Sequence, residues 1–551
     1  MIARSMRYAP LAVALMTVAA SAQQPAATPA FRFERPIVTG GAGPRRVQVD
    51  VALLAGSAAG LRDLRIFDAS GAEVEYVTIV DSRPAPPLTT PVAVERRPSE
   101  PGRSRFRLRL PGGRLPIVAL HLDSGDREVF GDVKVLEARL SGTQLTPVVV
   151  GRGTLMRAAD GNVTPADVRI DVEPVTEAQL DLEVDDRDNP PGVTAELRAL
   201  PWIYMTAPAG ALIARYGNST LTSPRYDLEA TREQIRIDEV PNAAWGEPRA
   251  RTAAMNATGA APPLPTVGAS LDPVLFKYVR TIPAGNPGVT VVGLDAGVLA
   301  HSAGADRGFA DLRVVDASNR QIPYVVERTA EPLPIDLAVE KMSSPPPALP
   351  STRSGRSVYR VAYPYDGLPA ARLVLTTGAR VFERRVSVAE EREPDRQGHR
   401  DRWIDTLATA RWVHADQDKP ATPLTLDVPP LHAGGLLVIV EEGDNIALPL
   451  AGARLLLPSY RIRFFREATA PLRALYGRAG EAAPRYDPAL LATQVLGTPV
   501  IDVALDAEPP IESPDSTAAV MSPRLFWAAL TIAVIVLLTL IVRMLKQESG
   551  N

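Results

Sequence analysis

Two acidic loops hold the densest groups of chemically useful side chains in this sequence. Each loop places three carboxylates and one amide within five positions: Asp185, Asp186, Asp188 and Asn189 in one, and Glu441, Glu442, Asp444 and Asn445 in the other. Ca²⁺ takes about six to eight oxygen ligands from loops of this kind, so both are candidate calcium sites. The alternative is a solvated turn in which Asp and Asn bond their own backbone, and we prefer it because neither loop has EF-hand spacing.

Carboxylates and histidines also serve hydrolytic enzymes. Glycoside hydrolysis needs two carboxyl groups about 5–9.5 Å apart across a sugar, and spacing within one turn does not show such a pair. The sequence has no His-Glu-x-x-His, Gly-x-Ser-x-Gly or Gly-x-x-x-x-Gly-Lys segment. Its five histidines are at least fifteen positions apart: His121, His301, His399, His414 and His432. We therefore assign no catalytic residue and expect a protein that is not an enzyme.

Four aromatic residues are the candidates for contact with a ligand or partner. They are Trp202, Tyr216, Trp412 and Tyr476. Exposed rings of this kind stack on sugars or anchor a protein interface. The alternative is a place in the core, where a Trp or Tyr buries a large area and needs a single polar partner.

Composition limits the classes that remain. The chain has 551 residues, enough for three or four domains, and a net charge of -3, which disfavours nucleic-acid binding. It has no cysteine. Disulfides, thiolate metal sites and cysteine nucleophiles are therefore excluded, and apart from the two possible calcium loops we expect no cofactor.

Both ends of the chain predict contact with a membrane. Arg4 and Arg7 precede an apolar run that ends in Ala20-Ser21-Ala22, which is typical of a signal peptide cleaved after Ala22. Residues 525–542 form an uncharged aliphatic run long enough for a transmembrane helix. We expect a single-pass protein of the inner membrane, with its body in the periplasm and its C-terminus in the cytoplasm.

The body between these ends contains an internal repeat. The segment Asp63–Ser70 recurs as Asp311–Ser318, and eight of the fifteen positions from residue 63 to residue 77 are identical at an offset of 248. The segment Leu212–Asp227 returns as Leu472–Asp487 at an offset of 260. Two copies of a unit of about 200 residues, with loops that lengthened, explain this pattern.

Each copy has the pattern of short β-strands. Phe106, Leu108 and Leu110 alternate with arginines, which predicts a strand with one apolar face and one face of guanidinium groups. Close turn signals between such runs favour antiparallel sandwiches over βαβ units. We expect an all-β fold of tandem duplicated jelly-roll or galactose-binding-like sandwiches with a few short helices, plus the C-terminal transmembrane helix. Leu64–Phe67 and Val74–Ile79 are expected to form a hairpin.

Proline- and alanine-rich stretches mark the expected domain boundaries. The segments are 1–22 for the signal peptide, 23–30 for a linker, 31–100 for a first β domain, 101–228 for a first β-sandwich, 229–269 for a helix and linker, 270–342 for a second β domain, 343–354 for a Pro-rich linker, 355–487 for a second β-sandwich, 488–523 for a helix and linker, 525–542 for the membrane helix and 543–551 for the tail.

The body resembles an uncharacterised bacterial family, domain of unknown function 3999. The resemblance rests on Arg35-Pro36, on Leu61–Gly71, on the strand with Phe130 and Val133, on the Asp-x-Asp-Asn loop and on Trp202–Gly217. A signal peptide and one C-terminal span are similar to the layout of that family. It has no established catalytic residues, so the resemblance implies none here. The later half of each copy also resembles a discoidin, or galactose-binding-like, β-sandwich.

These observations predict a non-catalytic, membrane-anchored periplasmic protein that presents tandem β-sandwich surfaces. The expected partner is a multi-spanning membrane protein of the envelope, because the tether places the body beside such proteins. Two alternatives remain, an envelope glycan-binding protein and an exported glycoside-active enzyme. The glycan hypothesis depends on the discoidin-like pattern, and the enzyme hypothesis requires carboxylates from separate segments to converge in one pocket.

Overall fold

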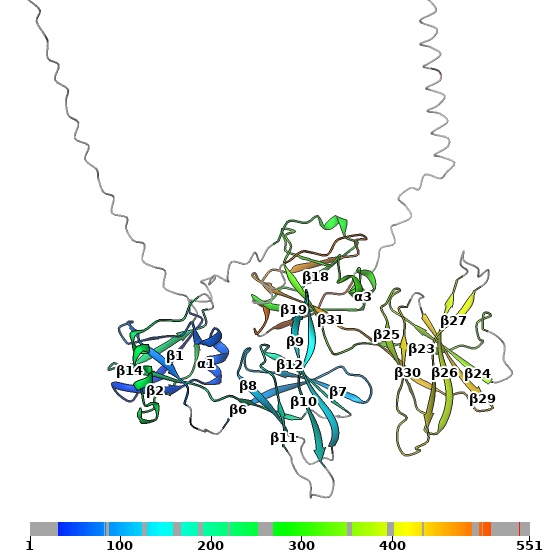
Figure 1. Ribbon diagram of the computed structural model, residues 1–551. Helices are drawn as coiled ribbons and strands as arrows, with labels where there is room; N and C mark the ends of the chain where they lie inside the picture. The colour runs from blue at the N-terminus through cyan, green and yellow to red at the C-terminus, as the bar shows by residue number, and fades with distance from the viewer. Residues whose placement is uncertain are drawn as a thin grey trace, which may run out of the picture.

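The computed structural model consists of β-sheets with a few short helices (Figure 1). It describes residues 31–81, 83, 87–123, 129–157, 167–185, 191–218, 221–251, 268–349, 355–393, 402–431, 435–486, 495–498, 500–508 and 539. The all-β, sandwich-like class expected from the sequence is therefore confirmed. The signal peptide lies outside the described residues, as does the membrane span apart from residue 539. Within the described residues, the helices all lack the length and apolar character that crossing a membrane requires.

The first small domain contains two sheets that enclose one apolar core. One sheet runs β16-β1-β15-β3-β4, with β17 also paired to β1, and the other runs β2-β14-β5. The strands are β1 (Phe33–Val38), β2 (Gly43–Gln48), β3 (Arg65–Phe67), β4 (Glu73–Val74), β5 (Tyr76–Ile79), β14 (Trp202–Ala207), β15 (Leu212–Tyr216), β16 (Ala244–Trp245) and β17 (Arg249–Ala250). The helices are α1 (Val51–Gly56), η1 (Ala59–Leu61), η2 (Asp227–Gln234) and η3 (Ile237–Glu239).

The first sandwich is inserted into the small domain between β5 and β14. Its sheets run β11-β8-β13-β6 and β6-β7-β12-β9-β10, and β6 passes from one sheet to the other. The strands are β6 (Leu88–Arg97), β7 (Arg103–Arg109), β8 (Ile117–Asp123), β9 (Val129–Ser141), β10 (Gln144–Arg157), β11 (Asp167–Asp171), β12 (Gln179–Asp185) and β13 (Gly192–Leu197). Phe106 and Leu108 are fully buried in its core, as the alternation predicted.

The second half of the chain repeats these strand orders. Its small domain has the sheet β18-β32-β20 and the strands β19, β31 and β21 side by side, and its sandwich has the sheets β22-β30-β25-β28 and β23-β24-β29-β26-β27. The small-domain strands are β18 (Tyr278–Ile282), β19 (Gly288–Leu294), β20 (Arg313–Val315), β21 (Tyr324–Arg328), β31 (Tyr460–Arg466), β32 (Leu472–Tyr476) and β33 (Ile501–Val503). Its helices are η4 (Pro273–Leu275), α3 (Ala296–His301) and η5 (Ala305–Arg307). The sandwich strands are β22 (Leu333–Leu337), β23 (Val339–Lys341), β24 (Gly355–Ala362), β25 (Ala371–Thr377), β26 (Phe382–Arg392), β27 (Trp403–His414), β28 (Leu424–Val428), β29 (Gly435–Gly443) and β30 (Leu450–Leu457).

The same polar contacts stabilise both small domains. The buried carboxylate of Asp63 accepts from the backbone N–H of Gly217 at 2.6 Å, and that of Asp311 accepts from Gly477 at 2.7 Å. The first helix begins after an aspartate whose side chain caps it, Asp50 in one half and Asp295 in the other. A side-chain oxygen that satisfies the free N–H groups of a first turn explains why these short helices start where they do.

The domain boundaries differ from those expected. Strand β6 lies in the first sandwich although it precedes residue 101, and β14 and β15 lie in the small domain although they precede residue 228. The second half shows the same insertion. The expected hairpin is also only partial, because β3 pairs with β4 while β5 pairs with β14. Pairing between strands far apart in the chain leaves no local sequence signal, so turn residues alone could not show it.

The two halves are joined by a contact that we call the joint. Strand β10 of the first sandwich pairs in parallel with β21 of the second small domain, Leu145 opposite Glu327, so that one sheet of twelve strands runs through both. In Figure 1, β9 and β10 lie below β19 and β31 at this point. The joint makes the first sandwich and the second small domain neighbours in space, although β14–β17 of the first small domain lie between them in the sequence.

Candidate functional site

The four predicted aromatic residues lie in four separate places. Tyr216 is 1% exposed, Tyr476 0% and Trp412 4%, so these three rings are core side chains. Trp202 of β14 is half-buried, and the guanidinium of Arg46 lies 4.4 Å from its ring centre. The structure therefore does not bring the four together into one binding surface, and their role in ligand contact stays a prediction.

The contacts of the buried rings describe the alternative role in the core. Tyr216 stacks on Phe33 at 5.5 Å between ring centres, and Tyr476 stacks on Tyr278 at 5.2 Å. The indole N–H of Trp412 donates to a backbone carbonyl at 2.9 Å. The two tyrosine rings thus have aromatic neighbours and the Trp412 indole has a polar partner, as is typical of buried aromatic side chains.

The acidic loops are described only in part. Asp186, Asp188 and Asn189 lie outside the described residues, and Asp185 ends β12. In the second loop, the carboxylate of Glu442 accepts from Arg384 at 2.6 Å and from a backbone N–H at 3.0 Å.

The remaining groups of the second loop bond locally. The side chain of Asn445 donates to the backbone carbonyl of Glu442 at 3.0 Å, as in a self-bonded turn, while Glu441 lies 3.9 Å from a guanidinium nitrogen of Arg356. Where the structure describes the chain, no group of three His, Cys, Asp or Glu side chains is placed to hold a metal ion. Calcium binding by these loops stays a prediction.

The described histidines are separate from one another. His121 Nε2 lies 2.7 Å from Glu196, His301 Nδ1 lies 2.9 Å from Glu508, and His414 bonds a backbone carbonyl. His399 and His432 fall outside the described residues. The His301 contact is a site that sequence reasoning did not find.

Polar and aromatic residues of the second small domain bind residues 501–508, the last described stretch of the body. Strand β33 pairs in parallel with β19, and the Nε of Arg280 donates to the carbonyl of Asp506 at 2.7 Å. Two residues later, Glu508 accepts from the hydroxyl of Tyr476 at 2.8 Å and lies against His301. Burial and the bond to Glu508 raise the pKa of Tyr476, so the hydroxyl keeps its proton and acts as a donor. We call residues 501–508 the exit segment.

A second polar cluster lies inside the joint. Arg463 is 1% exposed, with one nitrogen 2.6 Å from Glu177 and another 2.8 Å from Glu327, and Arg461 donates to Glu327 at 2.6 Å. Burial pushes the pKa of Glu327 up, but Arg461 and Arg463 outweigh it and hold the pKa at about 2. Burial raises the pKa of Glu177, and Arg463 offsets only part of that effect. Glu327 belongs to the second small domain, as Arg463 does, so of these two pairs the Arg463–Glu177 pair is the one that crosses between the halves.

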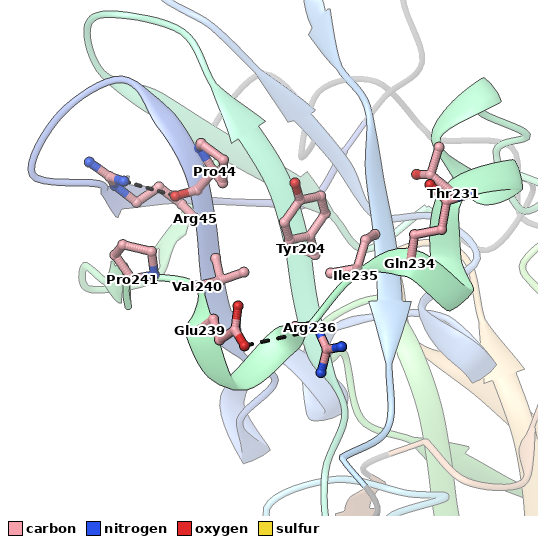
Figure 2. Close-up of a pocket in the computed structure, with 10 residues that line it drawn as sticks. All are labelled: Pro44, Arg45, Tyr204, Thr231, Gln234, Ile235, Arg236, Glu239, Val240 and Pro241. Atoms are coloured by element: carbon pink, nitrogen blue, oxygen red, sulfur yellow. Dashed lines mark hydrogen bonds and ion pairs between the residues drawn. The ribbon is translucent and has the colours of Figure 1, made fainter.

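An open groove of about 520 Å³ lies on the first small domain (Figure 2). Its floor is formed by β2 and β14, and its wall by the segment that joins and follows η2 and η3. The lining residues are Pro44, Arg45, Tyr204, Thr231, Gln234, Ile235, Arg236, Glu239, Val240 and Pro241. Figure 2 shows the Tyr204 ring near the centre of these residues, with Arg45 to its left and Arg236 below it.

Hydrogen bonds donated by Arg46 hold the wall of the groove in place. Its side chain donates to the carbonyl of Ile237 at 2.5 Å and to Asn242 at 2.8 Å, and its backbone N–H donates to Pro241 at 3.0 Å. The wall is thus tied to the edge of β2. The two guanidinium groups at the groove have different partners, because Arg45 bonds backbone carbonyls while Arg236 faces Glu239 at 4.0 Å.

The groove combines an aromatic ring, two aliphatic side chains and two cations on an open face. That chemistry suits contact with a protein segment that carries apolar and acidic side chains. A smaller cavity of about 300 Å³ lies where the second small domain meets the second sandwich, lined by Glu331 and Arg372 among others. Glu331 pairs with Arg97 at 2.7 Å, so this cavity belongs to contacts between domains.

Comparisons with known proteins give no family. No family model matches the chain, and no curated protein matches it. Among solved structures, an allantoicase is 10% identical, covering 71% of this chain and 93% of that chain with a TM-score of 0.11. A tandem of CBM22 domains from Paenibacillus barcinonensis is 8% identical, covering 70% and 97% with a TM-score of 0.13. An allantoicase from Saccharomyces cerevisiae is 9% identical, covering 73% and 100% with a TM-score of 0.11. TM-scores this low establish no shared fold.

Proposed function

We propose that this chain is a non-catalytic, membrane-anchored protein of the cell envelope that presents a rigid β-sheet body to a multi-spanning membrane protein. The body consists of two tandem copies of one unit, a small domain with a sandwich inserted in it. The repeated segments at residues 63 and 311, the matching strand orders and the paired contacts of Asp63 and Asp311 support this duplication.

The observation that carries the proposal is the exit segment. It leads from the body toward the apolar run at residues 525–542, and it is bound to the second small domain over its whole length. A loosely attached body would need no such contacts. A fixed exit sets the place on the body from which the chain leaves for the membrane, as a subunit that meets a membrane partner requires.

The joint supports the same function. Burying Arg463 between two carboxylates is favourable only with good geometry and full hydrogen bonding, so the halves are held in one relative position. A body fixed in this way offers surfaces at constant separation. The signal peptide at 1–22 and the tail at 543–551 then place the body in the periplasm and the C-terminus in the cytoplasm.

Crosslinking in membranes tests the proposal. The full-length chain and a version truncated before Ser522 are crosslinked, extracted in detergent and purified. We expect the full-length chain to capture one multi-spanning protein at constant stoichiometry. The truncated version shows whether the body alone retains the contact. Recovery of no specific membrane protein with either version would overturn the proposal.

A further inference from the structure

The groove on the first small domain has a counterpart on the second small domain. Ile203 of β14 and Ile462 of β31 each oppose a buried valine of the neighbouring strand and are themselves 0% exposed. The next residue along each strand therefore occupies the same position in both domains. It is Tyr204 on the floor of the groove and Arg463 in the joint.

In the second small domain, the first sandwich fills this place. The end of its β9–β10 hairpin contributes to one buried cluster, which contains Leu145, Val289, Val325 and Val495. Ala138 and Leu140 of the same hairpin pack against that cluster. We call these three hairpin residues the plug and the surface that receives them the socket.

The groove corresponds to the socket position by position. Adding 245 to a residue number on β2 gives its counterpart on β19, so Pro44 corresponds to Val289. Adding 260 to a residue number after β15 gives the counterpart after β32, so Ile235, Arg236 and Val240 correspond to Val495, Leu496 and Val500. In the described part of the chain, β5 ends its sheet, whereas its counterpart β21 continues into β10. The first small domain thus has an open socket with the same frame and different side chains.

The second sandwich has the matching counterpart of the plug. Glu137 and Arg139 form an ion pair of 2.8 Å on β9, and Glu390 and Arg392 form one of 3.1 Å at the same register on β26. In the first sandwich, the plug residues Ala138 and Leu140 lie between and just beyond the pair on β9, and Leu145 lies opposite Leu140 on β10. In the second sandwich, Glu391 of β26 stands where Ala138 does, Glu393 just after β26 stands where Leu140 does, and Arg402 just before β27 stands where Leu145 does.

The changes in the two counterparts are complementary in charge. The open socket gains the cations Arg45 and Arg236, the latter in place of a leucine. We call Glu391, Glu393 and Arg402 of the second sandwich the open plug. It gains the carboxylates of Glu391 and Glu393 in place of apolar side chains. Arg402 lies 2.6 Å from Glu393, and Glu239 lies 4.0 Å from Arg236. Counted over these described side chains, Glu391, Glu393 and Arg402 leave one negative charge, and Arg45, Arg236 and Glu239 leave one positive charge. Opposite potentials of this kind favour docking and set its register.

We propose that the open plug of one molecule docks in the open socket of a second copy of this chain, repeating between molecules the contact that the joint makes within one. The contact is heterologous, since it uses different surfaces on the two partners. It therefore generates rows or closed rings of molecules instead of a two-fold dimer. The proposal uses only the body and is independent of any other membrane partner.

Charge reversal tests the contact in the full-length chain in detergent, with mass measured by sedimentation over a range of concentrations. We expect the natural chain to associate reversibly and Arg236→Glu or Glu393→Arg to weaken association at least tenfold. The double variant Arg236→Glu with Glu393→Arg should recover most of it, because each reversed surface again meets its opposite. A chain that stays monomeric up to about 100 µM, or one whose association ignores both reversals, would overturn the proposal.

Matched controls separate docking from folding. Arg232→Glu reverses an exposed charge on η2 beside the groove, and Glu383→Arg reverses one at the far end of β26. Both should associate as the natural chain does. All variants should keep its melting temperature. If the controls weaken association as much as the test variants do, association depends on the overall charge of the chain and not on this contact, and the proposal fails.

The lack of native cysteine allows a direct test of geometry. Chains with Arg236→Cys and chains with Glu393→Cys are mixed and treated with a short thiol crosslinker. We expect a crosslinked pair in the mixture and little in either variant alone. Equal crosslinking within one variant alone would show a symmetric contact and contradict head-to-tail docking.

Discussion

Arg463 of the second small domain donates to Glu177 of the first sandwich at 2.6 Å, across 286 positions of the chain, with both side chains at most 2% exposed. The same guanidinium reaches Glu327 at 2.8 Å. A buried charge is tolerated only when its partners are in place, so this contact fixes the joint in one geometry. The predictions that follow test the contacts that give the body its shape.

Replacing Arg463 by Met should cost about 3–5 kcal/mol, because it leaves two carboxylates buried without their shared cation. Urea denaturation of the full chain in detergent measures the loss. Arg454→Met is the control, since that arginine forms an exposed pair with Asp336 and exposed pairs contribute about 0–1 kcal/mol. Equal losses for the two variants would show that burial of the joint contributes nothing.

The joint should weaken in acid. The pKa of Glu327 in the folded protein is about 2, below the ordinary value of 4.5, so its contribution to stability is present above pH 4.5 and is lost as the pH falls toward 2. The raised pKa of Glu177 acts with the opposite sign and at higher pH. The melting temperature should therefore fall below pH 4.5, and in Glu327→Gln it should fall less steeply. Parallel curves for the two chains would contradict this assignment.

Asp63 should be among the most sensitive positions of the first half. Its buried carboxylate accepts from the N–H groups of Ala58, Gly217 and Asn218 at 2.6–2.8 Å. Asp63→Ala leaves these donors without their partner, at about 1–3 kcal/mol for each that stays buried. Asp311→Ala should have a similar effect on the second half, which thermal denaturation of both variants can compare. A loss under about 1 kcal/mol would mean that water replaces the carboxylate.

Removing the Glu508 carboxylate should loosen the exit segment. Glu508→Ala removes the acceptor of Tyr476 and the partner of His301, so the amide of Asp506, which donates to Thr281 at 3.0 Å, should exchange faster with solvent. Hydrogen exchange read by mass spectrometry measures this. Exchange in the first small domain should stay unchanged, and so should that of the exposed control Glu340→Ala. Unchanged exchange at residues 501–508 would show that β33 alone holds the segment.

The sequence predicted the two faces of each strand better than it predicted which other parts of the chain pack against those faces. The alternation around Phe106 placed the apolar side chains correctly, because period-two spacing alone sets which residues share a face. The opposite face carries guanidinium groups, as the alternation predicted, and on it Arg107 is 1% exposed and pairs with Asp181 and Glu331. A domain from the other half of the chain covers it, and no local pattern records that.

For the candidate sites as well, the sequence showed which residues recur but not what surrounds them in the fold. The repeated Tyr216 and Tyr476 were visible as a pair, but only the packing of β15 and β32 shows that both rings are buried. The groove and the exit segment escaped sequence analysis because their residues come from segments far apart. Pro44 and Val240 line one groove, and His301 and Glu508 form one contact, without any shared motif.

The sequence by itself determined the all-β class, the recurrence of one segment pattern in both halves and the residue types that alternate along each strand. These properties follow from local propensity and side-chain period, which act over a few residues. Only the tertiary structure decided that each sandwich is inserted into a small domain, that the joint buries Arg463 and that the groove on the first half has the frame of a socket. Such relationships depend on which distant strands pair, and pairing is set by the free energy of the whole folded chain.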